Sequence, residues 1–313
     1  MRSPTGGGAS RDPTTAGAAG WGLALVSAAT VSWGTTGAVM AAVGHRGTLS
    51  PLAVGSLRLA IAGPLLLALA HVTGAFGERP LPPHLPRLAL MGAAQAAFQV
   101  GYFSAVPHIG VASTALVAIC ASPILIAALA VWILGERLTV RVLLAMGGGI
   151  AGTVLLVGGR LNLGGITPAV AAIGTGLALG AAVAYALYVV LAKALVGLLP
   201  PFAITGVSFA LGAVFLLPAA LAEPALWTAV RPVWPHLAYL GIVPTALAYA
   251  LYIRGLQTTS ATAASVCALL EPLTASVIGL VVFGESMGPQ GFAGGALLLG
   301  AVAYLLLGAP SRG

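Results

Sequence analysis

Long apolar runs alternate with short polar breaks along almost the whole chain. A bilayer core requires about 20 apolar residues in each crossing helix. Ten runs of about that length are separated by charged, Pro-rich or Gly-rich breaks, and they cover residues 21–43, 51–73, 87–106, 110–133, 140–158, 169–192, 202–221, 236–255, 261–283 and 289–308. Because a helix satisfies its backbone hydrogen bonds within its own segment, the pattern predicts an all-α polytopic membrane protein with ten transmembrane helices.

The stretch before the first run has a different character. Residues 1–20 are rich in Gly, Ser, Thr and Pro and have no hydrophobic period. We expect this segment to be a disordered cytoplasmic tail. The breaks between the ten runs are too short to fold as separate domains, so the bundle of helices is predicted to be the whole functional unit.

Composition narrows the classes of protein further. Of the 313 residues, 59% are hydrophobic and only 6% are charged, against roughly a quarter charged in soluble domains. That scarcity excludes a soluble enzyme, a disordered chain and a nucleic-acid binder. The formal net charge of +7 comes from basic residues scattered singly among apolar runs, which favours a role in membrane orientation.

The basic residues predict the orientation of the chain. With the N-terminus in the cytoplasm, most of them fall on the cytoplasmic side, namely Arg2, Arg11, Arg79, Arg87, Arg137, Arg141, Lys193, Arg254 and Arg312. Arg46, Arg160 and Arg231 fall outside. The positive-inside rule therefore predicts a multi-pass protein of the cytoplasmic membrane, with both termini cytoplasmic because the number of spans is even.

The chain also contains an internal repeat. A Pro…Gly-Glu pattern occurs twice at an offset of 149, as Ser122-Pro123 with Gly135-Glu136 and as Glu271-Pro272 with Gly284-Glu285. The two halves are residues 21–158 and 169–308, with five predicted helices each. An odd number of helices per half forces the halves to insert in opposite orientations, which is the inverted-repeat design of secondary transporters.

Together with several other positions, this pattern resembles the EamA-like branch of the drug/metabolite transporter superfamily. The residues that carry the resemblance are Ser32-Trp33-Gly34, Pro51 with Arg58-Leu59, Ser122-Pro123, Leu134-Gly135-Glu136, Glu271-Pro272 and Phe283-Gly284-Glu285. The resemblance covers residues 21–308. It implies a ten-helix carrier of small polar metabolites, often amino acids or related compounds, and export more often than uptake.

Two charges lie deep in predicted spans. Arg58 lies about two turns into its helix, where a charge must face a partner or water. Its guanidinium could bind a substrate carboxylate, or it could be a structural arginine held by backbone carbonyls or by Glu271. Glu271 is a candidate for proton coupling, because a carboxylate buried in a span can bind and release a proton. A fixed ion pair with Arg58 and a ligand for a substrate amine are the alternatives.

Polar residues mark one face on each of two further spans. Gln95, Gln99 and Tyr102 share a helical face, and Thr245, Tyr249 and Tyr252 repeat this pattern in the second half. We expect these faces to line a solute cavity, with interhelical hydrogen bonding as the alternative. Trp33, Tyr185 and Tyr188 could complete an aromatic wall or simply pack in the bundle.

Other features have a structural interpretation. Glu136 and Glu285 follow a glycine at a helix end, and we interpret them as structural, with a gating role as the alternative. The glycines around Gly152 and Gly294 are predicted to pack helices inside the bundle or to form a homodimer face. Neither the cysteines nor the histidines have metal-ligand spacing, so no metal or cofactor is predicted.

These patterns favour a carrier over other membrane proteins. An enzyme would need paired carboxylates, a metal cluster or a nucleophile beside a base, and an ATP-driven pump would need a Walker A sequence. We therefore expect a secondary transporter that exports a small polar solute through the lipid bilayer by alternating access, with protons as a candidate coupling ion. A multidrug or cation efflux carrier and a non-transporting subunit of a larger complex are the alternatives.

Overall fold

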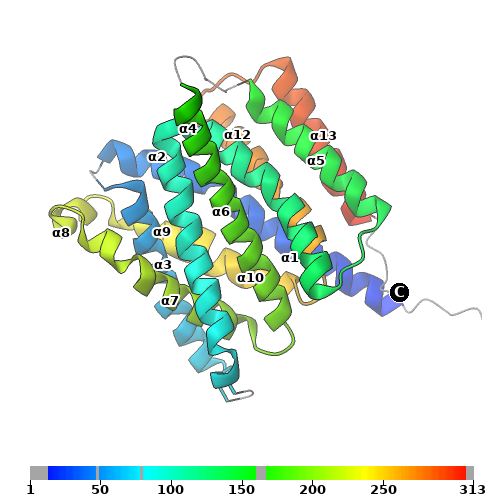
Figure 1. The fold of residues 1–313 in the computed structure, drawn as a ribbon, viewed down its shortest axis with the longest axis horizontal. Helices are drawn as coiled ribbons and strands as arrows, with labels where there is room; N and C mark the ends of the chain where they lie inside the picture. The colour runs from blue at the N-terminus through cyan, green and yellow to red at the C-terminus, as the bar shows by residue number, and fades with distance from the viewer. Residues whose placement is uncertain (1–12, 47–48, 78–79, 160–166, 308–313) are drawn as a thin grey trace, which may run out of the picture.

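The protein is a bundle of helices in the computed structural model, which describes residues 13–46, 49–77, 80–159 and 167–307 (Figure 1). Every regular element within those ranges is a helix. The elements are α1 (Pro13–Gly34), α2 (Thr36–Arg46), α3 (Pro51–Val72), η1 (Pro82–His84), α4 (Leu85–Leu134), α5 (Val140–Gly158), α6 (Pro168–Leu195), α7 (Pro201–Leu221), α8 (Leu226–Val230), α9 (Trp234–Gly241), η2 (Ile242–Leu247), α10 (Ala248–Gly255), α11 (Ala261–Ala268), α12 (Leu270–Val282) and α13 (Pro289–Leu307). The prediction of an all-α membrane fold is confirmed.

The number of crossings depends on one glycine. The described residues contain nine helical stretches that are long and apolar enough to span a bilayer, and one of these covers Pro82–Leu134. Within it, Gly110 has φ 80° and ψ 163°, which no helix allows, so α4 is two helices that meet at this residue. Each half is longer than the about 20 residues that a bilayer core requires, so the described residues form ten crossings, in agreement with the hydrophobic runs.

The first helix begins earlier than expected. The predicted tail covered residues 1–20, but α1 starts at Pro13, so the last part of that segment is helical. Proline is well suited to the first position of a helix, and the alanines that follow it are strong helix formers. Residues 1–12 lie outside the described residues, and the tail prediction for them stays a prediction.

The repeated Gly-Glu pair forms the same helix end twice. Gly135 and Gly284 both have left-handed backbone angles, with φ 66° and 65°. The next N–H, from Glu136 or Glu285, bonds back to the carbonyl of Ala130 or Gly279, and these carbonyls are again 149 residues apart. A left-handed residue after a helix favours glycine because glycine lacks a Cβ, which explains why this position recurs in both halves.

The two halves interlock by packing matching helices together. The second helix of one half, α3, packs along the second helix of the other half, α7, and the fifth helices α5 and α13 pack in the same way. Figure 1 shows α5 and α13 side by side at one edge of the bundle. A contact between a helix and its own counterpart is expected where a pseudo-twofold axis passes between them, as it does in inverted repeats.

Small residues allow these helices to approach closely. A Cβ added at Gly152 would lie 2.7 Å from the backbone N of Leu298 and 2.8 Å from the carbonyl O of Gly294. A Cβ at Gly63 would lie 2.7 Å from the backbone N of Ala210. These glycines therefore pack helices of a single chain together, as the sequence predicted for Gly152 and Gly294. The homodimer remains a prediction.

Candidate functional site

The residues that the sequence singled out converge in the middle of the bundle. The first half contributes Trp33 from α1, Arg58 from α3, and Gln95, Gln99 and Tyr102 from α4; the second half contributes Tyr185 from α6, Tyr249 and Tyr252 from α10, and Glu271 from α12. Most of these side chains are buried, while Tyr102 and Glu271 are partly accessible. Both halves therefore build one central cluster, as expected for a site at a repeat interface.

Aromatic rings form the wall of this cluster. The ring of Trp33 lies 4.8 Å from Tyr249, 5.2 Å from Tyr252 and 6.3 Å from Tyr185, measured between ring centroids. These spacings fall within the range of favourable aromatic pairs. Trp33 therefore connects the first half of the chain to three tyrosines of the second half.

Two phenylalanines extend the wall, and sequence reasoning missed both. Phe209 of α7 lies 4.8 Å from Tyr249, and Phe98 of α4 lies between Tyr185 at 5.8 Å and Tyr102 at 5.7 Å. An apolar side chain in an apolar span carries no signal of its own. The one clue was that Phe98 lies three residues after Gln95, on nearly the same helical face.

Arg58 is held by a side chain of the other half. Its Nε donates to Oγ1 of Thr245 at 3.1 Å, and both residues are buried. Thr245 in turn donates to the carbonyl of Leu240 at 2.6 Å. Of the two structural partners considered from the sequence, backbone carbonyls and Glu271, neither is the hydrogen-bond partner found among the described residues.

The backbone around Thr245 explains this geometry. Residues Ile242–Leu247 form a π-helical turn, η2, between α9 and α10. Pro244 has no N–H to donate to the carbonyl of Leu240, so the hydroxyl of Thr245 donates to it instead. Such wide turns concentrate at functional sites, and here the turn presents Thr245 to Arg58.

Glu271 lies at a break in the ninth crossing. The helix is interrupted at Leu269, between α11 and α12, and Pro272 immediately follows the glutamate. Since proline cannot donate to the carbonyl one turn back, it loosens the helix at this point. Glu271 lies near Arg58, but it has no ion-pair partner among the described residues.

Several buried polar atoms in the cluster lack partners. Nε2 of Gln95 donates to the Tyr249 hydroxyl at 3.4 Å, whereas Oε1 of Gln95 has no hydrogen bond. Nε1 of Trp33 and Oγ of Ser32 are likewise buried without a partner in the described part of the chain. An unsatisfied buried polar group costs about 1–3 kcal/mol. A polar molecule bound beside Trp33 could satisfy these atoms.

Gln99 lies beside this cluster, against α3. A Cβ at Gly55 would lie 3.1 Å from Oε1 of Gln99, so the glycine makes room for the amide. Gln99 is buried on the same face of α4 as Gln95, and this places it next to the helix that carries Arg58.

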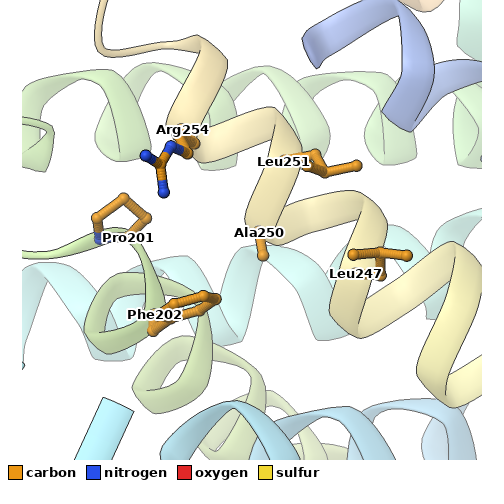
Figure 2. A pocket seen from close by; sticks show the side chains of 6 residues that line it. All are labelled: Pro201, Phe202, Leu247, Ala250, Leu251 and Arg254. Carbon is orange, nitrogen blue, oxygen red and sulfur yellow. The ribbon is translucent and has the colours of Figure 1, made fainter. Parts of the chain in front are cut away.

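A pocket lies on another part of the bundle. It has a volume of about 150 Å³ and lies between the start of α7 and α10, and Figure 2 shows the side chains that line it. It is lined by Pro201, Phe202, Leu247, Ala250, Leu251 and Arg254. The lining residues of α10 occupy the face opposite Tyr249 and Tyr252, so this pocket faces away from the central cluster.

Comparison with known proteins identifies the family. The model of the EamA-like transporter family matches residues 20–158 and, a second time, residues 172–307. The chain belongs to the EamA-like transporter family. The two matches coincide closely with the two halves of the internal repeat, and the chain is a membrane transporter of this type.

Relatives agree with this assignment. The uncharacterized transporter YwfM of Bacillus subtilis (strain 168) is 31% identical over 85% of this chain and 87% of its own length. An uncharacterized transporter of Archaeoglobus fulgidus is 32% identical over 64% of this chain and 69% of its own length. A crystal structure with 24% identity has a TM-score of 0.78 and covers 92% of this chain and 97% of its own, which supports the fold.

Proposed function

We propose that the protein is a secondary carrier that exports small polar metabolites, such as amino acids or related compounds, from the cytoplasm. The halves of the bundle would rock about the central cluster and open it to one side of the membrane at a time. In this proposal both termini are cytoplasmic and the membrane is the cell membrane, as the distribution of Lys and Arg indicates.

The observation that carries the proposal is that one aromatic cluster has two opposite charges beside it, Arg58 and Glu271, which form no ion pair with each other among the described residues. Arg58 uses Nε to bind Thr245, and its guanidinium has four further N–H donors that suit a carboxylate. Glu271 lies within electrostatic reach and is partly accessible. A solute that carries a carboxylate and an amine could bridge the two groups. The unpartnered atoms of Gln95 and Trp33 would bind its remaining polar groups.

Glu271 is also our candidate for proton coupling. It is the carboxylate of the central cluster, and its helix is interrupted beside it. Proton binding would change its charge as the site moves from one face of the membrane to the other. Liposomes with an imposed pH gradient test this part separately. A transport rate that is the same with and without the pH gradient would indicate facilitated diffusion.

Purified protein in liposomes tests the proposed function. A thermal-shift screen against amino acids, nucleosides and cationic drugs identifies solutes, and the best of them are then assayed for transport. We expect amino acids or related zwitterions to stabilise the protein and to be carried by the wild type. Arg58→Ala should abolish that transport while the variant remains folded and monodisperse.

The same screen addresses the alternative functions. Aromatic rings beside a carboxylate are also what a cation efflux carrier would need, and this observation keeps that function as the second candidate. Stabilisation by cationic drugs alone would favour a cation carrier, because a site that uses Arg58 to bind a carboxylate would repel such drugs. A screen with no response at all would favour a non-transporting membrane subunit.

A further inference from the structure

A glutamate from one half of the chain caps a helix of the other half. Oε1 of Glu136, just after α4, accepts the N–H of Ala261 at 2.6 Å. Oε2 accepts the N–H and the hydroxyl of Thr262 at 3.2 and 2.9 Å. These are the first residues of α11, where N–H groups have no partner within the helix and attract a carboxylate. The contact therefore joins the two repeats through charge-assisted hydrogen bonds.

A lysine binds the backbone at the same end of the bundle. Nζ of Lys193, near the end of α6, donates to the carbonyls of Leu256 and Thr259 at 2.6 and 2.7 Å. These carbonyls belong to the connection that leads into α11. Glu136 and Lys193 thus bind the two ends of one short connection, residues 256–262.

The ninth crossing is packed more tightly at this end than at the other. Its first part, α11, packs against α4, and Thr262, Ser265 and Cys267 are at most 1% exposed. Its second part, α12, shares the neighbours α1, α5 and α13 with α11 but also packs against α2, and both Glu271 and Thr274 are partly accessible. Within the ninth crossing, α11 thus packs against α4 and accepts the Glu136 cap, whereas α12 is the more accessible part.

The inverted repeat defines the counterpart of this contact. Glu285 corresponds to Glu136 at the offset of 149, and Ala112 and Ser113 correspond to Ala261 and Thr262. Ala112 and Ser113 lie in the first turn of the second half of α4, which follows the non-helical Gly110. In the structure the carboxylate of Glu285 lies over Gly279 of its own crossing, where a side chain would collide with it. Glu285 thus lies against its own crossing, whereas Glu136 binds a helix of the other half.

We propose that Glu136 and Glu285 are alternating latches that close opposite ends of the central cluster. Glu136 holds one end shut in the conformation described above, by capping α11. When that end opens, Glu136 releases Ala261 and Thr262, and Glu285 caps the second half of α4 at Ala112 and Ser113. The proposal rests on alternating access, the mechanism of the proposed function, and it assigns the closing step to two named residues.

Cys267 provides a reporter for this movement. Its thiol is fully buried in α11, and Cys120→Ser would leave it as the single cysteine. In that background we measure the rate at which a small polar maleimide labels the purified protein without solute. We expect Glu136→Gln to raise the labelling rate by about tenfold or more. The glutamine amide is uncharged, and it has one oxygen to accept hydrogen bonds where the carboxylate has two. An unchanged rate would overturn the latch.

Two further variants serve as controls. Ser260→Ala removes the hydroxyl that caps Ala263 at the same helix start, but it breaks no bond between the repeats. It should change the labelling rate less than twofold, and an increase equal to that of Glu136→Gln would reduce the latch to a local helix effect. Glu285→Gln should slow labelling, because it weakens the opposite closed state; faster labelling would overturn the symmetric scheme.

The labelling assay requires no transported solute, so it separates the latch from the proposed function. Slow labelling in the wild type and fast labelling in Glu136→Gln would support the latch even where no solute is carried. Normal transport with unchanged labelling in Glu136→Gln would refute the latch and leave the carrier intact. Melting temperatures of each variant show that labelling reports opening of folded protein.

Discussion

The two halves of the chain share one fold but differ in the charge each brings to the centre. Arg58 in the first half corresponds to Ser208 in the second, and Glu271 in the second corresponds to Ser122 in the first. Both serines are buried and turn back on their own helices, with Ser208 bonded to the carbonyl of Ile204 and Ser122 to that of Ala118. A serine whose hydroxyl bonds a carbonyl of its own helix needs no partner from the central cluster. A buried charge, by contrast, needs a partner or water.

This difference separates the scaffold from the solute site. The Gly-Glu helix ends and the glycine crossings recur in both halves because both halves need the same packing. The charges do not recur, so each half offers a different group to the cluster. A solute with distinct positive and negative ends fits such a site better than a symmetric one.

The largest expected effect comes from removing the positive charge. Arg58→Ala should lower the transport rate in liposomes by roughly 100-fold, since it removes a charged donor from a buried site. Ser208→Ala is the matched control and should change the rate less than twofold, because its hydroxyl bonds its own helix. Equal loss in both variants would mean that the two positions are both structural.

Removing the negative charge should have the next largest effect. Glu271→Gln should lower transport about 10-fold to 100-fold and abolish any response to an imposed pH gradient, because the amide cannot bind a proton. Ser122→Ala should behave like the wild type. A pH response that survives in Glu271→Gln would assign coupling to another group.

The support of Arg58 by Thr245 should matter less than Arg58 itself. Thr245→Val keeps the shape but removes the oxygen that accepts from Nε, and we expect transport to fall about tenfold. Thr245→Ser restores the oxygen and should restore the rate to within about twofold. If valine and serine behave alike, the hydrogen bond to Arg58 does not orient the guanidinium.

The smallest effect is expected at Tyr249. Tyr249→Phe keeps the ring against Trp33 but removes the hydroxyl that binds Gln95, so KM should rise roughly threefold with little change in turnover. Tyr304→Phe, far along the chain on α13, is the control and should leave KM unchanged. A larger effect on turnover than on KM at Tyr249 would contradict a role in binding.

The sequence allowed much of the fold to be predicted, for identifiable reasons. Ten apolar runs marked the crossings, and the repeated Gly135-Glu136 pattern revealed the inverted halves because a left-handed residue restricts the choice of side chain. The start of α1 was missed because residues 13–20 combine helix-forming alanines with flexible glycines. Local composition alone does not decide between helix and coil in such a segment.

The site was predicted less completely. Charged and polar residues stood out in apolar spans, so Arg58, Glu271 and Gln95 could be named. Their partners could not be named, because the contact of Arg58 with Thr245 depends on a π-helical turn that no residue pattern predicts. Phe98 and Phe209 looked like any other apolar residue, and the three-part contact of Glu136 with α11 depends on how the halves pack.

The most direct test of the charge pair compares one solute with an analogue that lacks its carboxylate. Wild type and Arg58→Ala are assayed in liposomes with an amino acid that the protein carries and with the corresponding decarboxylated amine. If Arg58 binds the carboxylate, Arg58→Ala should slow transport of the amino acid roughly 100-fold and that of the amine less than about threefold. An equal loss for both solutes would contradict the assignment of Arg58 to the solute site.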